Sequence, residues 1–278
     1  MDPYLAIQFA LLVEAAEAVA PDNLTNAAGQ TLNVSYGAIN LAYKVLTTIY
    51  ANDLATDANP NRGNDTKSFG LLLQAPNNDL VIAIRGTDDI WEWMDDAEFL
   101  TVTFPYLAGA GTTEDGFTAI YKSLRIGSDP ASAHVTDALA TLPINRPAGA
   151  LTICGHSLGG AVATLLALDT AANTAFKTPA VFTYASPRTG DPAFVTTYNQ
   201  VVPNTFRIAN RKDLVPKLPL PPFYGHVLGL YELLPGNSVK LDLACQHHLT
   251  TYLFLLTQLA AQSAPANPIL PLDAGCAS

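Results

Sequence analysis

The strongest structural signal in the sequence is Cys154-Gly155-His156-Ser157-Leu158-Gly159-Gly160. It contains the pattern Gly-x-Ser-x-Gly, preceded by an apolar, β-prone run at residues 150–154 and followed by small and apolar residues at 161–168. A strand, a sharp turn and a helix are the context in which this pattern builds a nucleophile elbow. Glycine is required on both sides because a Cβ would clash in so tight a turn. We therefore predict that the serine hydroxyl stands clear of the sheet, beside a helix N-terminus that favours negative charge.

The composition is that of a globular α/β protein. The chain has 278 residues, of which 49% are hydrophobic and 14% are charged. That length is enough for one large core, so we predict a single domain over residues 1–278. The net charge of −10 argues against a nucleic-acid partner, because phosphates require a basic surface.

The sequence indicates no transmembrane segment. Residues 3–20 are rich in Ala and Leu, but Glu14 and Glu17 interrupt them and no basic residue precedes them. They predict neither a signal peptide nor a spanning helix. If the protein is secreted, its signal peptide is not part of this sequence.

The three cysteines leave one question open. Cys154 lies in the predicted central strand, where we expect a buried free thiol. Cys245 and Cys276 could form a bridge that ties the C-terminal tail to the body, but the sequence does not fix their pairing.

Helices alternate with strands along the middle of the chain. Helices are predicted over residues 6–20, 36–50, 117–125, 134–142 and 249–261, and strands over 69–74, 80–85, 150–154, 181–184, 205–209 and 238–243. The turn-rich segment 75–79 predicts a hairpin, so the sheet begins antiparallel. The alternation then predicts a mainly parallel central sheet with helices on both faces.

A nucleophilic serine needs a base, and the base needs an orienting acid. In hydrolases with this elbow, the acid and then the histidine follow the serine. His134 comes before the elbow, and His226 lies among prolines, where a packed histidine is expected. His156 occupies the x position of the motif and should turn away from the serine. His247 and His248 remain as candidates for the base.

Two aspartates follow predicted strands and are candidates for the acid. Loops after strands carry the working residues of an open α/β sheet. Asp191 precedes a proline and fits a turn or a helix cap. We therefore predict Asp213 as the acid, with an ion pair to Arg211 or Lys212 as the structural alternative.

An oxyanion hole needs two donors. One should be the N–H of Leu158, next to the nucleophile, and the other should come from Thr87, in the loop after an earlier strand. Arg85 in that loop is expected to be structural, paired with an acid such as Asp96.

The segment after Thr87 predicts a lid. Residues 89–99 place apolar side chains on one helical face and acidic ones on the other, and they carry both tryptophans of the protein. The predicted lid and substrate-binding residues are Ile90, Trp91, Trp93 and Met94. The alternative is an ordinary surface helix packed on the core.

Taken in order, these segments resemble the class 3 lipases, especially the triacylglycerol lipases of filamentous fungi. The resemblance covers about residues 65–255 and rests on Ile84 to Thr87, Trp93, Asp96, Gly116-Phe117, Gly155 to Gly160, Ser186 to Phe194 and Asn210 to Pro216. It implies an α/β-hydrolase fold with a short helical lid. It also implies a triad of Ser157, Asp213 and His248, with Thr87 and Leu158 as the oxyanion hole.

The resemblance favours His248 because the family histidine precedes a leucine and, soon after, a tyrosine, here Leu249 and Tyr252. Three features depart from the family pattern. Asp115 stands where a histidine is frequent, the fungal disulfide set is absent, and the spacing to Tyr252 is one residue longer. The spacing keeps His247 as an alternative.

We expect a triacylglycerol lipase that forms an acyl-enzyme on Ser157 and needs no metal or organic cofactor. The alternatives are a phospholipase A1, a feruloyl-type carbohydrate esterase and, outside catalysis, an inactive hydrolase fold that serves as a binding module. The expected partner is a lipid or other ester at an oil–water interface. We expect an extracellular protein, with a cytoplasmic one as the alternative, and the sequence indicates no oligomeric state.

Overall fold

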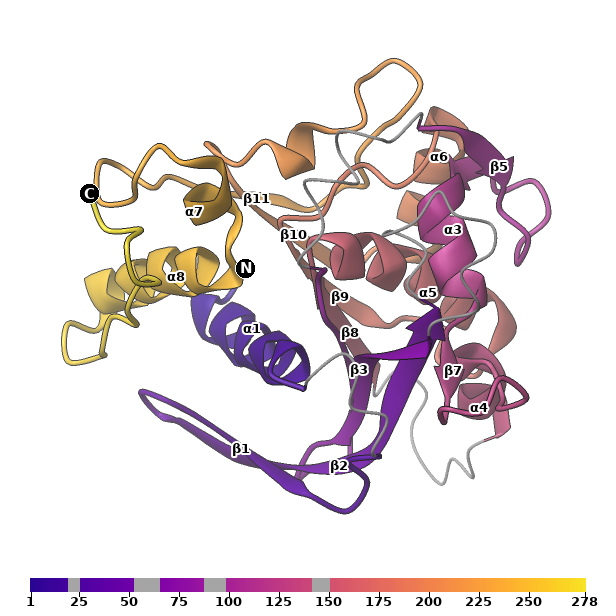
Figure 1. The fold of residues 1–278 in the computed structure, drawn as a ribbon, viewed down its shortest axis with the longest axis horizontal. Helices are drawn as coiled ribbons and strands as arrows, with labels where there is room; N and C mark the ends of the chain where they lie inside the picture. Colours follow the sequence, from indigo (N-terminus) through magenta and orange to yellow (C-terminus); the bar gives the residue numbers. More distant parts are fainter. Residues whose placement is uncertain (20–25, 53–65, 88–98, 142–150) are drawn as a thin grey trace.

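The computed structural model describes residues 1–19, 26–52, 66–87, 99–141 and 151–278 (Figure 1). Its main sheet has the order β1-β2-β3-β4-β8-β9-β10-β11, with β7 paired to β2. The strands are β1 (Thr31–Tyr36), β2 (Ile39–Asn52), β3 (Thr66–Gln74), β4 (Leu80–Ile84), β7 (Arg125–Ile126), β8 (Leu151–His156), β9 (Ala180–Tyr184), β10 (Thr205–Asn210) and β11 (Leu230–Leu233), and β5 (Thr101–Thr103) pairs with β6 (Thr112–Glu114) in a small second sheet.

The half of the main sheet that carries the elbow is parallel. β4 pairs with β8, β8 with β9, β9 with β10 and β10 with β11, all in parallel register. β3 and β4 form the predicted antiparallel hairpin. Because parallel strands end at the same edge, the loops after β4, β8 and β10 lie close together.

Helices cover both faces of the sheet, as predicted (Figure 1). On one face lie α3 (Asp115–Lys122), α4 (Val135–Thr141), α5 (Leu158–Asn173) and α6 (Pro192–Val201), and on the other lie α1 (Pro3–Glu17) and α8 (Leu249–Ser263). Two apolar cores follow, one between each layer of helices and the sheet. The arrangement is the predicted α/β fold.

The tight turn between β8 and α5 depends on its glycines. Ser157 has φ 55° and ψ −126°, which is strained for a residue with a side chain. A Cβ on Gly155 would lie 2.3 Å from the carbonyl oxygen of Gly159, and a Cβ on Gly159 would lie 2.2 Å from that of Arg85. The elbow and the loop after β4 therefore touch backbone to backbone.

The first helix places an acidic residue beside the same edge. Asp2 caps α1, and its carboxylate accepts the N–H of Tyr4 at 2.8 Å, while Pro3 is the first residue of the helix. Its apolar side packs on β3, β4, β8 and α8. The helix ends at Glu17, close to the loop after β4.

The predicted helix over residues 36–50 is wrong, because that segment forms most of β2. β2 returns from β1 through a turn at Gly37, which has φ 54°. The second half of β2 is buried on both faces between β3 and β7. Burial on both faces removes the alternation that identifies a strand, and periodicity alone does not distinguish such a segment from a buried helix.

The predicted strand over residues 238–243 is also wrong. Only an isolated bridge between Val239 and Ala277 forms there, and Asp242 instead caps the short helix α7 (Leu243–His247). β11 is the edge strand next to β10 in its place.

Replacing Gly159 with alanine should destabilise the protein because the new Cβ would press on the backbone of Arg85. Forcing extra atoms into a packed site typically costs about 1–3 kcal/mol. We expect a loss in this range in the free energy of unfolding, measured by urea denaturation. Gly109→Ala is the matched control, since its Cβ meets nothing within 4 Å and only its φ of 76° is unfavourable. Equal stability of Gly159→Ala and the parent chain would contradict the close contact.

Candidate active site

Three side chains from three separate segments form a hydrogen-bonded chain. Ser157 Oγ lies 2.8 Å from Nε2 of His247, and Nδ1 of His247 lies 2.9 Å from Oδ2 of Asp213. Ser157 and Asp213 are fully buried and His247 is 4% exposed. With Nδ1 protonated, the imidazole donates to Asp213 and its Nε2 accepts the serine proton. This is the geometry of a nucleophile, a base and an orienting acid.

His248 does not lie in this chain, so its predicted place is taken by His247. The Nδ1 atom of His248 lies 2.7 Å from Oδ2 of Asp273, and its side chain is 43% exposed. His247 is the last residue of α7 and His248 separates α7 from α8. Adjacent residues at such a junction point in different directions, and the hydrogen bonds to Ser157 and Asp213 identify His247, not His248, as the base.

Asp213 is held by more than the histidine. It follows β10, as predicted, and its Oδ1 accepts the N–H of Val215 at 3.0 Å. Its Oδ2 also accepts the hydroxyl of Tyr252 at 2.8 Å. The alternative ion pair is absent among the described contacts of Asp213, and Arg211 instead pairs with Glu232. Three donors thus fix this buried carboxylate.

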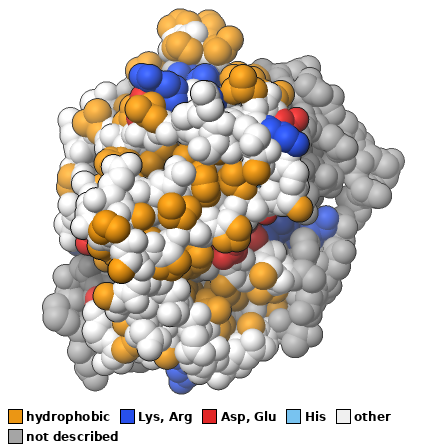
Figure 2. Space-filling model, turned by 90° about the vertical axis from the view of Figure 1, so that its left-hand side faces the viewer, with side chains coloured by type: hydrophobic (Ala, Val, Ile, Leu, Met, Phe, Trp, Pro, Cys, Tyr) orange, Lys and Arg blue, Asp and Glu red, His pale blue; other side chains and the backbone are white. Residues whose placement is uncertain are grey.

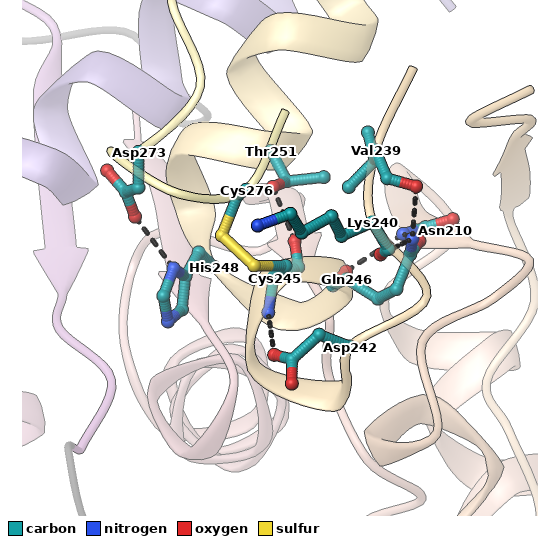
Figure 3. The surroundings of a disulfide bond; sticks show 10 residues. All are labelled: Asn210, Val239, Lys240, Asp242, Cys245, Gln246, His248, Thr251, Asp273 and Cys276. Atoms are coloured by element: carbon teal, nitrogen blue, oxygen red, sulfur yellow. Dashed lines mark hydrogen bonds and ion pairs between the residues drawn. A yellow bond between two sulfur atoms is a disulfide. The ribbon is translucent and has the colours of Figure 1, made fainter. Parts of the chain in front are cut away.

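The short helix α7 that carries His247 is anchored on several sides (Figure 3). Cys245 forms a disulfide with Cys276, which joins α7 to the C-terminal tail. Asp242 accepts the N–H of Cys245 at 3.1 Å, and Asn210 donates to the main-chain oxygen of Gln246 at 2.8 Å. A helix of five residues has little stability of its own, so these contacts determine where the base lies.

The surroundings of His247 favour its neutral form. Burial lowers the pKa of His247 below its usual 6.5, although the charge of Asp213 and the hydrogen bond to it oppose the shift. The neighbouring rings of His156 and His248 lower it further. A neutral imidazole at neutral pH can accept the serine proton.

The other histidines and Asp191 have structural contacts. His156 turns away from the serine, as predicted, and contacts Glu17 and the main-chain oxygen of His247. Burial lowers the pKa of His226 to about 3, and its Nε2 bonds the carbonyl of Pro216. Asp191 caps α6 through the N–H of Phe194 at 2.7 Å.

The predicted oxyanion donors lie on the two loops that meet at the elbow. Leu158 is the first residue of α5, so its N–H is among those without an acceptor inside the helix. Thr87 follows Gly86, and Gly86 lies against the elbow: a Cβ added at Gly86 would lie 3.4 Å from the main-chain oxygen of His156. The assignment of both donors stays a prediction.

Several predicted features lie outside the described residues. These are the lid residues Ile90, Trp91, Trp93 and Met94, and Asp96 as the partner of Arg85. Arg85 itself donates to the carbonyl of Ser68 at 2.8 Å and to that of Gly86 at 2.9 Å. In the part of the chain that the structure describes, no helix is long and apolar enough to cross a membrane. The predicted free thiol of Cys154 is confirmed as buried, and burial raises its pKa.

Comparisons with known proteins agree on one family. The family model for lipase (class 3) matches residues 81–223, about half of the chain. A secreted mono- and diacylglycerol lipase A from Penicillium cyclopium is 34% identical over 179 residues, 64% of this chain and 55% of that protein. A phospholipase A1-II 1 from Oryza sativa is 31% identical over 51% of this chain and 39% of its own. The chain thus spans about half the length, or less, of these relatives.

The fold has a solved counterpart as well. A crystal structure of MDLA from Penicillium cyclopium aligns with a TM-score of 0.56 and 24% identity, covering 86% of this chain and 80% of that one. At this level of identity the likeness shows the fold, which is that of the α/β-hydrolases predicted from the sequence.

Replacing His247 should remove the reactivity of Ser157, whereas replacing His248 should not. We expect His247→Ala to slow phosphonylation of Ser157 by a fluorophosphonate at least about 10²-fold, the lower range for a general base. His248→Ala, at the neighbouring position, should keep the rate within the same order of magnitude. Mass spectrometry of the labelled peptide measures both rates. A large loss in His248→Ala with full reactivity of His247→Ala would contradict the observed geometry.

Removing the disulfide should destabilise the protein. Cys245 and Cys276 are 31 residues apart, and a crosslink over such a loop contributes about 3–4 kcal/mol in the chain-entropy model. We expect Cys245→Ala/Cys276→Ala to lose about this much in urea unfolding. Dithiothreitol should destabilise the parent chain and leave the double variant unchanged. Insensitivity of the parent chain to dithiothreitol, with thiol titration proving reduction, would contradict this expectation.

Proposed function

Because this chain belongs to the class 3 lipase family, we propose that it is a serine carboxylic-ester hydrolase, most specifically a triacylglycerol lipase. The observation that carries the proposal is the unbroken hydrogen-bonded chain from Ser157 through His247 to Asp213. The family match covers the elbow and Asp213. Activity and substrate are proposals, since the chain spans only part of the length of its relatives.

The mechanism follows from the geometry. His247 takes the proton of Ser157, and the serine oxygen attacks the ester carbonyl. The N–H of Leu158 and the N–H or hydroxyl of Thr87 would stabilise the oxyanion. The alcohol leaves with the proton from His247, and an acyl-enzyme remains. Water, activated by the same imidazole, then releases the carboxylic acid, while Asp213 keeps the ring oriented throughout.

An apolar loop next to Asp213 supports a lipid substrate. The loop between the 3₁₀ turn η1 (Val215–Lys217) and β11 has Leu220 at 65% and Phe223 at 75% exposure. It rises at the top of Figure 1, and hydrophobic side chains form the top of the face in Figure 2. Arg188 holds the base of the loop through the carbonyls of Lys217 and Pro219. We propose that this loop contacts the oil surface.

Phospholipase A1 activity is the second candidate, because relatives named phospholipase A1-II match about half of this chain. Feruloyl-type esterase activity and an inactive binding module remain further alternatives. The complete triad argues against the inactive module, since a binding surface has no need for a buried serine, imidazole and carboxylate in line.

We further propose an extracellular protein with one catalytic domain. The disulfide between Cys245 and Cys276 suits an oxidising compartment, and the relative from Penicillium cyclopium is named as secreted. The continuous sheet from β1 to β11 supports a single domain.

A graded set of esters tests the proposed function. We expect the parent chain to hydrolyse p-nitrophenyl esters and tributyrin, with activity lost by at least about 10³-fold in Ser157→Ala. Phosphatidylcholine and methyl ferulate, assayed beside triacylglycerols of increasing chain length, separate the alternatives. Preference for phosphatidylcholine would favour phospholipase A1, and full esterolysis by Ser157→Ala would reject the proposal.

The exposed loop should matter only at an interface. We expect Leu220→Ser/Phe223→Ser to reduce activity on an emulsified triacylglycerol several-fold. Binding to the oil surface loses about 25 cal/mol of free energy for each Å² of apolar side chain that the variant no longer buries there. Activity on a soluble p-nitrophenyl butyrate should stay unchanged. Leu241→Ser, at an 82% exposed leucine elsewhere, is the matched control. An equal loss on both substrates would contradict interfacial contact of the loop.

The pH profile should show a base with a lowered pKa. Activity requires neutral His247, so kcat/KM rises as the pH increases through the pKa of that ring. Since burial lowers this pKa below 6.5, we expect the midpoint of the acid limb below pH 6.5. A midpoint clearly above 6.5 on a soluble ester would contradict the assignment.

A further inference from the structure

His156 contacts both the base and the first helix of the chain. Its Nδ1 lies 2.9 Å from Oε1 of Glu17, at the end of α1. Its Nε2 lies 2.9 Å from the main-chain oxygen of His247. The rings of His156 and His247 are 5.0 Å apart, and the side chain of His156 is only 8% exposed. One buried ring thus joins segments that are far apart in sequence.

The partners of His156 determine its protonation. A carbonyl oxygen can only accept, so Nε2 of His156 carries a proton. Oε1 of Glu17 also accepts the N–H of Gly86 at 3.3 Å. Burial raises the pKa of Glu17, but the charge of His156 and the hydrogen bonds from His156 and Gly86 outweigh burial and lower this pKa. Glu17 is therefore a carboxylate, and Nδ1 of His156 carries a proton as well. A ring with both nitrogens protonated is an imidazolium.

We propose that Glu17 and His156 form a buried carboxylate–imidazolium pair that positions both the catalytic base and the oxyanion loop, and that its positive end keeps the base neutral. This inference rests on the proposed function and adds two positioning residues to it. Neither residue touches the reacting atoms.

The first effect of the pair is on the main chain of the base. His247 ends α7, and carbonyls in the last turn of a helix have no partner within the helix. The N–H of His156 satisfies this oxygen. Because the bond fixes the backbone from which the imidazole extends, it also fixes the distance between that ring and Ser157.

The second effect is on the loop after β4. The carboxylate of Glu17 accepts the N–H of Gly86, directly before the predicted oxyanion residue Thr87. A Cβ on Gly86 would lie 3.0 Å from Nδ1 of His156 and 3.4 Å from Oε1 of Glu17. The pair therefore packs against this loop so closely that only glycine fits without displacement.

The third effect is electrostatic. Burial opposes the charged form of His156, but the charge of Glu17 and the hydrogen bond to it outweigh burial and raise the pKa of His156. The positive charge of His156 faces His247. Burial is the main cause of the lowered pKa of His247, and the charge of His156 lowers this pKa further. Among the described residues, the other titratable or charged groups around these rings and Glu17 are Glu14 on α1, Arg85 after β4, Asp213 after β10, His248 after α7 and Tyr252 on α8.

Variants that remove the charges test the proposal. Glu17→Gln leaves His156 neutral, so the pKa of His247 rises and the acid limb of kcat/KM moves up by about half a unit to one unit. His156→Gln should move it further, because the carboxylate of Glu17 remains. The double variant should resemble Glu17→Gln. We expect kcat to fall about tenfold in each with KM nearly unchanged, since a misplaced base slows chemistry.

Glu14→Gln is the matched control, with the same change of charge on the same helix. It should leave the acid limb in place. Urea unfolding of every variant distinguishes a loss of stability from a displacement of the His247 ring in a folded protein. Loss of activity in proportion to unfolded protein, with an unmoved acid limb, would assign the pair a merely structural role and overturn the proposal.

The rate of phosphonylation of Ser157 provides a readout that does not depend on the natural substrate. If Ser157 of the parent chain reacts but the acid limb does not move in either single variant, the proposed role of the pair is rejected. The proposal that the chain is a hydrolase then stays intact. A parent chain with no reactivity at Ser157 would reject the proposed function. In that case ¹⁵N NMR of the His156 ring decides the pair: protonation of both nitrogens at pH 7.5 supports it, and a neutral tautomer overturns it.

Discussion

The hydrogen bond of 2.8 Å between Ser157 Oγ and His247 Nε2 is the contact on which the site depends. It requires a serine in a strained backbone conformation and an imidazole from a segment 90 residues later. The parallel strands place both at one edge of the sheet. Glycines at positions 155 and 159 let the turn pack on its neighbours, and the dense contacts around it hold the strain in place.

The rest of the molecule restrains the partners of that bond. α7 is too short to position His247 alone, and the disulfide, the tail and β10 supply the contacts that it lacks. Glu17 and His156 connect the same helix to α1 and to the loop after β4. Elements from both ends of the chain thus converge on one imidazole. Small displacements of such a group reduce the rate strongly, which accounts for the number of supporting contacts.

The sequence predicted the parts of the site that local chemistry determines. The motif around Ser157 requires a particular turn, and Asp213 follows a recognisable strand, so both could be placed. The choice of His248 over His247 was wrong, because it depends on how a helix of five residues meets α8. Glu17 was missed since its contact with His156 spans 139 residues. β2 was mistaken for a helix because the second half of the strand is buried on both faces, which removes there the alternation that identifies a strand.

The assignment of Ser157 as the nucleophile and His247 as its base can be tested by a crystal structure of the chain after reaction with a long-chain alkyl phosphonate. We expect phosphorus bonded to Ser157 Oγ, with Nε2 of His247 within hydrogen-bonding distance of a phosphonate oxygen or of Oγ. A second phosphonate oxygen should accept the N–H of Leu158 and a donor of Thr87. An adduct at another residue, or one at Ser157 with His248 rather than His247 facing the phosphonate, would contradict it.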